Sequence, residues 1–268
     1  MFLAAAPVLM AAGYEAEILA WRAQRESNLK SDTGWLTVAG LFWLKEGKNT
    51  FGSAATNDIV LPGGPAHAGA FVLHGGKVTG GLAGKPPRPL KFESEDPADV
   101  VTIGDLTMFA IKRGDRYGIR LRDKNSTFRR EFTRLRWFPV KASACVTARW
   151  VAAAGKIVIP NILGQRDEEN SPGYAVFQWD GREQRLYPTE EEGRLFFVFR
   201  DLTTGKETYP AGRMFYADMP HDGHVVLDFN KAYNPPCAFT PFATCPLPPP
   251  QNRLPVRIEA GELKYGSH

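Results

Sequence analysis

The chain has 268 residues, which corresponds to two domains at most at the usual size of about 150 residues, and to one if the fold is all β. Hydrophobic residues make up 43% and charged residues 23%, which excludes a disordered chain and a coiled coil. The net charge is +4 without a dense Lys/Arg stripe, so we expect no nucleic-acid partner.

Residues 1–13 (MFLAAAPVLMAAG) are apolar and uncharged. A membrane span needs about 20 apolar residues, so this segment is too short to cross a bilayer, and no other stretch reaches that length. The segment matches the apolar region of a secretory signal, with Ala11 and Gly13 at the small-residue positions, although the basic start is missing. We therefore expect a signal-peptide remnant and a periplasmic or secreted protein. The alternative is a floppy or packed apolar N-terminus, which leaves a cytoplasmic location open.

Residues 14–33 follow a helical pattern. Apolar positions at Tyr14, Ile18, Trp21 and Leu29 alternate with charged residues, which predicts an amphipathic helix that ends near residues 31–34.

Beyond residue 34, short apolar runs alternate with Gly, Pro, Asn and Asp turns. The Asp180-Gly181 pair is typical of a type I′ hairpin turn. We expect a mainly β fold, sandwich-like or barrel-like, of antiparallel sheets with one N-terminal helix. The expected hairpins join 41–44 to 49–51, 70–73 to 77–79, 108–111 to 117–121, 175–179 to 184–187, 195–200 to 207–209, and 215–219 to 225–229.

The proline distribution suggests how the chain is divided. Residues 86–89 (PPRP) mark a boundary between a β-rich subdomain at 34–85 and a main β domain at 86–268. Eight of the 21 residues from Pro235 to Pro255 are proline, which lacks the amide donor that a sheet interior requires. We therefore expect an extended strap over residues 234–255.

Sequence motifs exclude several chemistries. HExxH, G-x-S-x-G and paired CxxC motifs are absent. The GGLAGK run at 80–85 differs from a phosphate loop, because Thr79 stands at the first glycine position and Pro86 at the Ser/Thr position. We expect a turn there, and no cofactor.

Polar side chains gather at strand ends just before the strap, as a small-molecule site requires. Two arginines on one strand face would suit a carboxylate or phosphate. The alternatives are a polar network that pins the strap and a solvated sheet face. The residues expected to bind the ligand are Arg120, Arg122, Tyr209, Arg213, Asp228, Asn230, Tyr233 and Asn234.

The cysteines allow two interpretations. In an oxidising compartment, Cys237 and Cys245 could form a disulfide within the strap, and Cys145 would be a core thiol. Alternatively, Cys237 could be a nucleophile with His221 or His224 as its base.

His221 and His224 are also the residues that could ligate a metal, with Asp218 and Asp222 nearby. Their imidazoles would have to converge across a tight turn. We therefore expect a solvated hairpin tip and no metal.

Two stretches carry a family resemblance: 34–62, from Gly34-Trp35-Leu36 to Asn57-Asp58-Ile59-Val60-Leu61-Pro62, and 228–255 (DFNKAYNPPCAFTPFATCPLPPPQNRLP). From about Trp21 to Glu262 the chain resembles the bacterial family called domain of unknown function 1684. The resemblance implies an exported or lipid-anchored bacterial protein without an assigned activity, so it supplies no catalytic residues.

A second resemblance lies within residues 34–85. Thr50-Phe51-Gly52-Ser53, followed by residues 57–61, resembles the opening of forkhead-associated domains, β-sandwiches that bind phosphothreonine peptides. Ser53 stands where that family has its phosphate-binding arginine, and residues 64–67 (GPAH) replace its Ser-Arg-x-His element. The resemblance therefore implies a sandwich without phosphopeptide binding.

Three functions follow from these patterns. The first is an exported protein that binds a small polar or anionic ligand in a pocket roofed by the strap. The second is a hydrolase or lyase that uses Asp228 or Tyr233 of that pocket as an acid or base. The third is an envelope interaction or scaffold protein without a small-molecule site. The sequence leaves open whether the protein is an enzyme and whether it forms oligomers.

Overall fold

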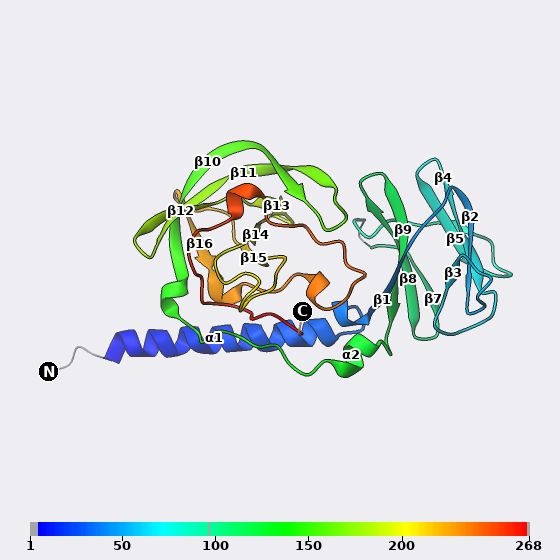
Figure 1. The fold of residues 1–268 in the computed structure, drawn as a ribbon, viewed down its shortest axis with the longest axis horizontal. Coiled ribbons are helices and arrows are strands. Elements are labelled where there is room, and N and C mark those ends of the chain that lie inside the picture. The colour runs from blue at the N-terminus through cyan, green and yellow to red at the C-terminus, as the bar shows by residue number, and fades with distance from the viewer. Residues whose placement is uncertain (1–4, 96, 267–268) are drawn as a thin grey trace. The chain divides into compact units, whose positions relative to one another are not determined.

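The structure is a computed structural model that describes residues 5–95 and 97–266, with side chains from Gly13 onward. Its contacts divide the chain into two compact units. We call Leu29–Phe132 the sandwich unit, and Met1–Asn28 together with Thr133–His268 the strap unit. Both units consist mainly of antiparallel strands, and Figure 1 labels most of their helices and strands.

The sandwich unit consists of two sheets, with strand orders β1-β9-β8-β7 and β3-β2-β4-β5-β6. Phe51 and Phe71 of one sheet share a hydrophobic core with Met108 and Ile119 of the other. The short β2–β3 pairing is parallel. Its elements are β1 (Val38–Trp43), β2 (Gly47–Gly52), β3 (Ile59–Val60), β4 (Gly69–His74), β5 (Lys77–Leu82), β6 (Arg88–Pro89), β7 (Val100–Ile103), β8 (Leu106–Arg113), β9 (Arg116–Asp123) and the short helix α2 (Thr127–Glu131).

The strap unit has sheets of order β12-β11-β10-β16 and β13-β14-β15. Phe177, Phe197 and Phe215 from these sheets pack in one core with Phe229 and with Ile258 from the C-terminal segment. Its elements are helix α1 (Ala5–Lys30), β10 (Cys145–Pro160), β11 (Arg166–Trp179), β12 (Arg182–Leu186), β13 (Thr189–Glu191), β14 (Arg194–Phe199), β15 (Arg213–Ala217) and β16 (His224–Asp228).

The strap, residues 234–255, contains no strand and only two short 3-10 helices, Pro236–Ala238 and Pro250–Asn252. Its backbone still pairs with the body of the unit at single points. Leu254 N donates to Arg200 O at 2.7 Å, and Leu247 N donates to Pro160 O at 2.6 Å. The strap is therefore an ordered segment. Its backbone hydrogen bonds to the body of the unit come from non-proline residues, which keep an N–H donor.

Helix α1 confirms the predicted N-terminal helix but begins at Ala5 and ends at Lys30. Ile18, Trp21, Arg22 and Arg25 lie on its inward face at helical spacing. Arg22 donates a hydrogen bond to Phe138 O at 3.0 Å, so this face also carries buried cations. The predicted signal remnant at 1–13 falls partly on residues 1–4, which lie outside the described residues.

Three predicted hairpins are confirmed: β4–β5, β8–β9 and β11–β12. In the last of these, Asp180 and Gly181 both have positive φ (49° and 72°), as a type I′ turn requires. The other three predicted hairpins are wrong. β1 pairs with β9 and β2 with β4; β14 pairs with β13 and β15; and β16 pairs with β10.

The division into units differs from the predicted boundary at residue 86. β6 (Arg88–Pro89) pairs with β5 at the edge of a sheet, where proline is tolerated. β1 pairs with β9, so residues before and after 86 form the same sandwich. The proline cluster is therefore an edge strand, and the chain divides at residues 28/29 and 132/133.

Across residues 5–95 and 97–266, no helix is both long and apolar enough to cross a membrane.

Candidate functional site

Arg213 on β15 is fully buried in the strap unit. Its guanidinium donates hydrogen bonds to the carbonyl oxygens of Ile258 (2.9 Å) and Ala260 and lies 3.4 Å from the Asp201 carboxylate. Burial lowers the pKa of Arg213, and attraction to Asp201 opposes this effect. The side chain therefore braces the segment that follows the strap.

Asp228 and Asn230 lie at the end of β16 and join three segments of the strap unit. Tyr14 Oη donates to Asp228 Oδ1 at 2.8 Å, and the Asn230 backbone N–H donates to the same oxygen at 3.1 Å. The Asn230 amide accepts from Lys141 N at 3.0 Å and donates to Lys141 O at 2.8 Å. Burial raises the pKa of Tyr14, and the hydrogen bond to Asp228 adds to this rise. These hydrogen bonds link α1, residue 141 and the end of β16 and hold them together.

Tyr233 and Asn234 lie at the start of the strap, against α1. The Arg25 guanidinium lies 4.5 Å from the centre of the Tyr233 ring and donates to Asn234 O at 3.0 Å. Burial raises the pKa of Tyr233. Asn234 Nδ2 donates to Leu263 O at 2.8 Å, so this amide also ties the strap to the C-terminal segment.

Sequence reasoning missed Glu262, which is fully buried beside this junction. Glu262 Oε2 accepts from Asn234 N at 2.6 Å and lies 3.8 Å from Arg25 Nε. Burial raises the pKa of Glu262 to about 7. A single glutamate near the C-terminus has no local sequence pattern that distinguishes it from a solvated one, so only the fold reveals it.

Tyr209 contacts the strap at its first cysteine. The Tyr209 hydroxyl donates to Cys237 O at 2.8 Å, and burial raises the pKa of Tyr209. The structure contains no disulfide between Cys237 and Cys245. Cys237 and Cys245 are nevertheless in contact, because Cys237 N donates to Cys245 Sγ at 3.2 Å.

Arg120 and Arg122 lie on β9 of the sandwich unit, whereas the other expected ligand residues belong to the strap unit. Arg120 is fully buried, pairs with Glu93 at 2.6 Å and lies 5.0 Å from the Trp35 ring centre. The Arg122 guanidinium lies 4.6 Å from the Phe109 ring centre, and burial lowers the pKa of Arg122. Both guanidinium groups thus contact side chains of the sandwich unit, to which they belong.

His221 and His224 are both exposed and form an isolated antiparallel bridge across the Asp222-Gly223 turn. His221 Nδ1 lies 3.1 Å from the Asp222 carboxylate, and His224 Nδ1 lies 2.8 Å from Asp222 O. In the part of the chain that the structure describes, no group of three or more His, Cys, Asp or Glu side chains could hold a metal ion.

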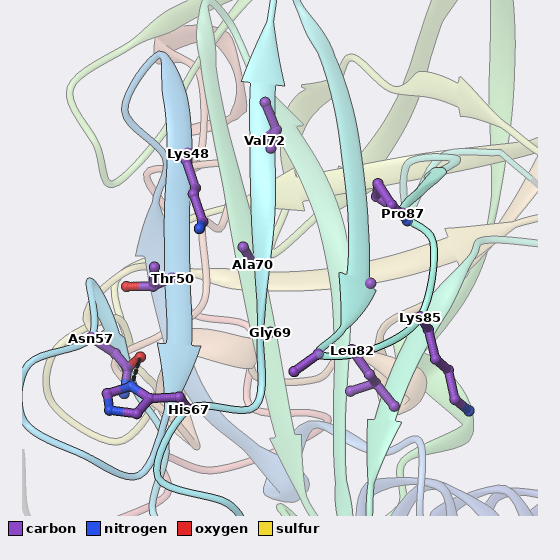
Figure 2. Close-up of a pocket in the computed structure, with 13 residues that line it drawn as sticks. Lys48, Thr50, Asn57, His67, Gly69, Ala70, Val72, Leu82, Lys85 and Pro87 are labelled. Carbon is purple, nitrogen blue, oxygen red and sulfur yellow. Dashed lines mark hydrogen bonds between the residues drawn. The ribbon is translucent and has the colours of Figure 1, made fainter.

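The sandwich unit carries an open hollow of about 540 Å³ on its outer face, shown in Figure 2. Phe51 and Phe71 point into the core, so their neighbours Thr50, Ala70 and Val72 face the other way, into the hollow. Thr50, Ala70 and Gly81 are paired in register and form a row of small residues across β2, β4 and β5. The floor of the hollow is therefore flat and mostly apolar.

Two lysines and a histidine lie around this floor (Figure 2). Lys48 lies on β2, and Lys85 follows β5 in the turn of the GGLAGK run; neither has an ion-pair partner among the described residues. The Asn57 amide donates to two carbonyl oxygens, Ala54 O and Ala66 O, so its Oδ1 faces His67 Nδ1 at 3.3 Å. An amide oxygen can only accept, so this contact places a proton on His67 Nδ1.

The strap unit has a second hollow, of about 450 Å³, whose lining includes Lys141, Trp179, Asp180, Arg257 and Glu259. Glu259 lies 3.4 Å from Lys141 Nζ and 3.1 Å from Arg257, so these charges compensate one another. This hollow therefore lacks the uncompensated charge of the first.

These features define a mainly antiparallel β protein whose C-terminal unit is braced by a buried polar network. The chain belongs to the family described as "Protein of unknown function (DUF1684)", whose model matches residues 130–263. This match coincides closely with the C-terminal part of the strap unit and is shorter than the expected match from Trp21 to Glu262.

Among solved structures, the chain is similar to an uncharacterized protein from gene locus rrnAC0354 of Haloarcula marismortui, studied by solution NMR. The two are 30% identical, with 52% of this chain and 81% of that chain covered, and the TM-score is 0.43. No curated protein matches the chain. The resemblance of residues 34–85 to forkhead-associated domains has no support from these comparisons.

Proposed function

We propose that the protein binds a small, largely apolar molecule that carries an anionic group, in the hollow of the sandwich unit. One observation carries this proposal: small side chains form a row on the outward face of three adjacent strands, between two lysines without an ion-pair partner among the described residues. The residues expected from the sequence are less suited to this role, because Arg213, Asn230 and Asn234 hydrogen-bond to backbone carbonyl oxygens of their own unit.

The floor has little free space at Gly81. A Cβ on Gly81 would lie 3.1 Å from Pro87 Cα. Apolar floors with a few polar groups are typical of ligand sites, and each Å² of apolar surface removed from water contributes about 25 cal/mol. The floor therefore favours a flat or slender apolar body in the ligand.

The lysines beside the hollow support an anionic group on the ligand. Lys48 and Lys85 are exposed cations that form no ion pair with a described carboxylate, and His67 adds a polar group on the same side. A unit charge at about 4 Å in water is attracted by about 1 kcal/mol, and salt screens this attraction. An anionic group on the ligand is thus favoured over a neutral or cationic one.

8-Anilinonaphthalene-1-sulfonate, an apolar aromatic anion, is a direct probe of this proposal. We expect saturable fluorescence enhancement with the full chain, weakened about fivefold by either Lys48→Gln or Lys85→Gln and further by added salt. Ala70→Trp would fill the hollow and should abolish binding. Lys77→Gln, an exposed lysine at the start of β5 that does not line the hollow, is the matched control and should bind like the wild type.

An unsaturable response, or equal binding by the wild type and by Ala70→Trp with its circular dichroism unchanged, would exclude the hollow as the ligand site.

We also propose that the protein is exported, which the uncharged apolar composition of residues 1–13 supports. The intact mass of the protein purified from its native host tests this proposal. A mass that lacks the N-terminal segment is expected, and a full-length chain recovered from the cytoplasm would contradict it.

A further inference from the structure

Cys237 and Cys245 form a pair of adjacent thiols within the strap. Cys237 lies in the 3-10 helix Pro236–Ala238, and its backbone N–H donates to Cys245 Sγ at 3.2 Å. Both sulfur atoms are thus within reach of each other without unfolding of the strap.

The backbone on both sides of the pair is held in place. Tyr209 Oη donates to Cys237 O at 2.8 Å, and Ile162 N donates to Cys245 O at 3.1 Å. These bonds attach each cysteine to the body of the strap unit. The folded structure therefore holds the two cysteines close together, and their contact does not depend on random motion of a flexible loop.

We propose that Cys237 and Cys245 are a redox-active dithiol. Low-molecular-weight disulfides oxidise this pair to an intramolecular disulfide within the strap. The Cys237 thiolate attacks one sulfur of the oxidant, here glutathione disulfide, forms a mixed disulfide and releases one glutathione thiolate. The Cys245 thiol loses its proton to solvent and attacks Cys237 Sγ, which releases the second glutathione. Two protein thiols are oxidised, and one glutathione disulfide is reduced to two glutathiones.

Burial assigns different roles to the two cysteines. Cys237 is partly exposed, whereas Cys245 is 3% exposed, so an external disulfide reaches Cys237 first. The hydrogen bond from the Cys245 thiol lowers the pKa of Cys237, which favours its thiolate. Cys245 is placed to resolve the mixed disulfide.

Cys145 provides a comparison within the same chain. Burial raises the pKa of its thiol, and the nearby Asp228 carboxylate adds to this rise. We expect Cys145 to react more slowly than Cys237, and Cys145→Ser gives a background in which only the strap cysteines contribute.

The test is incubation of the folded full chain, in the Cys145→Ser background, with glutathione disulfide, followed by intact-mass measurement. We expect loss of two hydrogens. Adding Cys245→Ser should instead trap one glutathionyl group on Cys237, and adding Cys237→Ser should leave Cys245 unmodified until the protein is denatured.

Alkylation of the unsubstituted protein is a second measurement that does not depend on the folding of variants. Peptide masses after a short treatment with iodoacetamide should show Cys237 modified before Cys245 and Cys145. Equal reactivity of the three cysteines, or a stable glutathione adduct on the protein with both strap cysteines, would overturn the proposal.

Discussion

Glu262 shows how a single residue can control stability in this protein. Its carboxylate is fully buried, and its Oε1 atom has no hydrogen-bond partner among the described residues. The closest cation, Arg25 Nε, lies 3.8 Å away, too far for a hydrogen bond. Desolvation therefore outweighs the attraction to Arg25, and the pKa of Glu262 rises from 4.5 to about 7.

This shift predicts a pH-dependent stability. Below about pH 4.5 the folded and unfolded chains both hold the Glu262 proton, so the contribution of protonated Glu262 to the free energy of unfolding is fully present. As the pH rises to about 7, the unfolded chain releases the proton that the folded chain retains, so the free energy of unfolding falls by a few kcal/mol. Glu262→Gln should remove this fall, as measured by urea unfolding at pH 5 and pH 8.

Glu183→Gln, at an exposed carboxylate on β12, is the control and should keep the wild-type profile. If Glu262→Gln also retained the wild-type pH dependence, the proton on the buried carboxylate would not be its source.

At the scale of elements, the strap meets the turn before β15 at Gly212. This glycine has φ +94°, a conformation that L side chains rarely adopt. A Cβ at residue 212 would lie 2.6 Å from both Phe199 O and the Pro248 ring. The close approach of the strap to this turn therefore requires a residue without a side chain.

We expect Gly212→Ala to destabilise the protein by about 2–4 kcal/mol, because the strained φ and the displaced strap both contribute. Gly205→Ala is the matched control. Gly205 also has positive φ (+82°) but no atom near its Cβ position, so we expect a cost of only about 1 kcal/mol. Denaturant midpoints of the two variants test this difference in stability. Equal midpoints would mean that contact with the strap adds no steric cost at residue 212.

At the scale of the whole molecule, each unit has its own hydrophobic core, built around Phe71 in the sandwich unit and Phe197 in the strap unit. Truncation of a buried phenylalanine costs about 3–5 kcal/mol. Phe71→Ala should therefore raise amide hydrogen exchange in β2, β4 and β5 while β10, β11 and β14 keep their protection, and Phe197→Ala should do the reverse. Exchange that rises in both units with either variant would show that they unfold together.

Much of the local structure could be predicted from the sequence alone. The helical spacing from Tyr14 onward, the short apolar runs and the Asp180-Gly181 turn depend on neighbours along the chain, and they led to the correct fold class and three correct hairpins. The motif-rich segment at 228–255 also led to the family, because its residues are contiguous.

Tertiary structure decided the rest. β1 could pair with the adjacent β2 or with the distant β9, and only the burial of a shared core favours β9. The contact of Glu262 with Arg25 joins opposite ends of the chain. The hollow of the sandwich unit arises because small side chains from three strands meet in one row, and no single segment of sequence contains that arrangement.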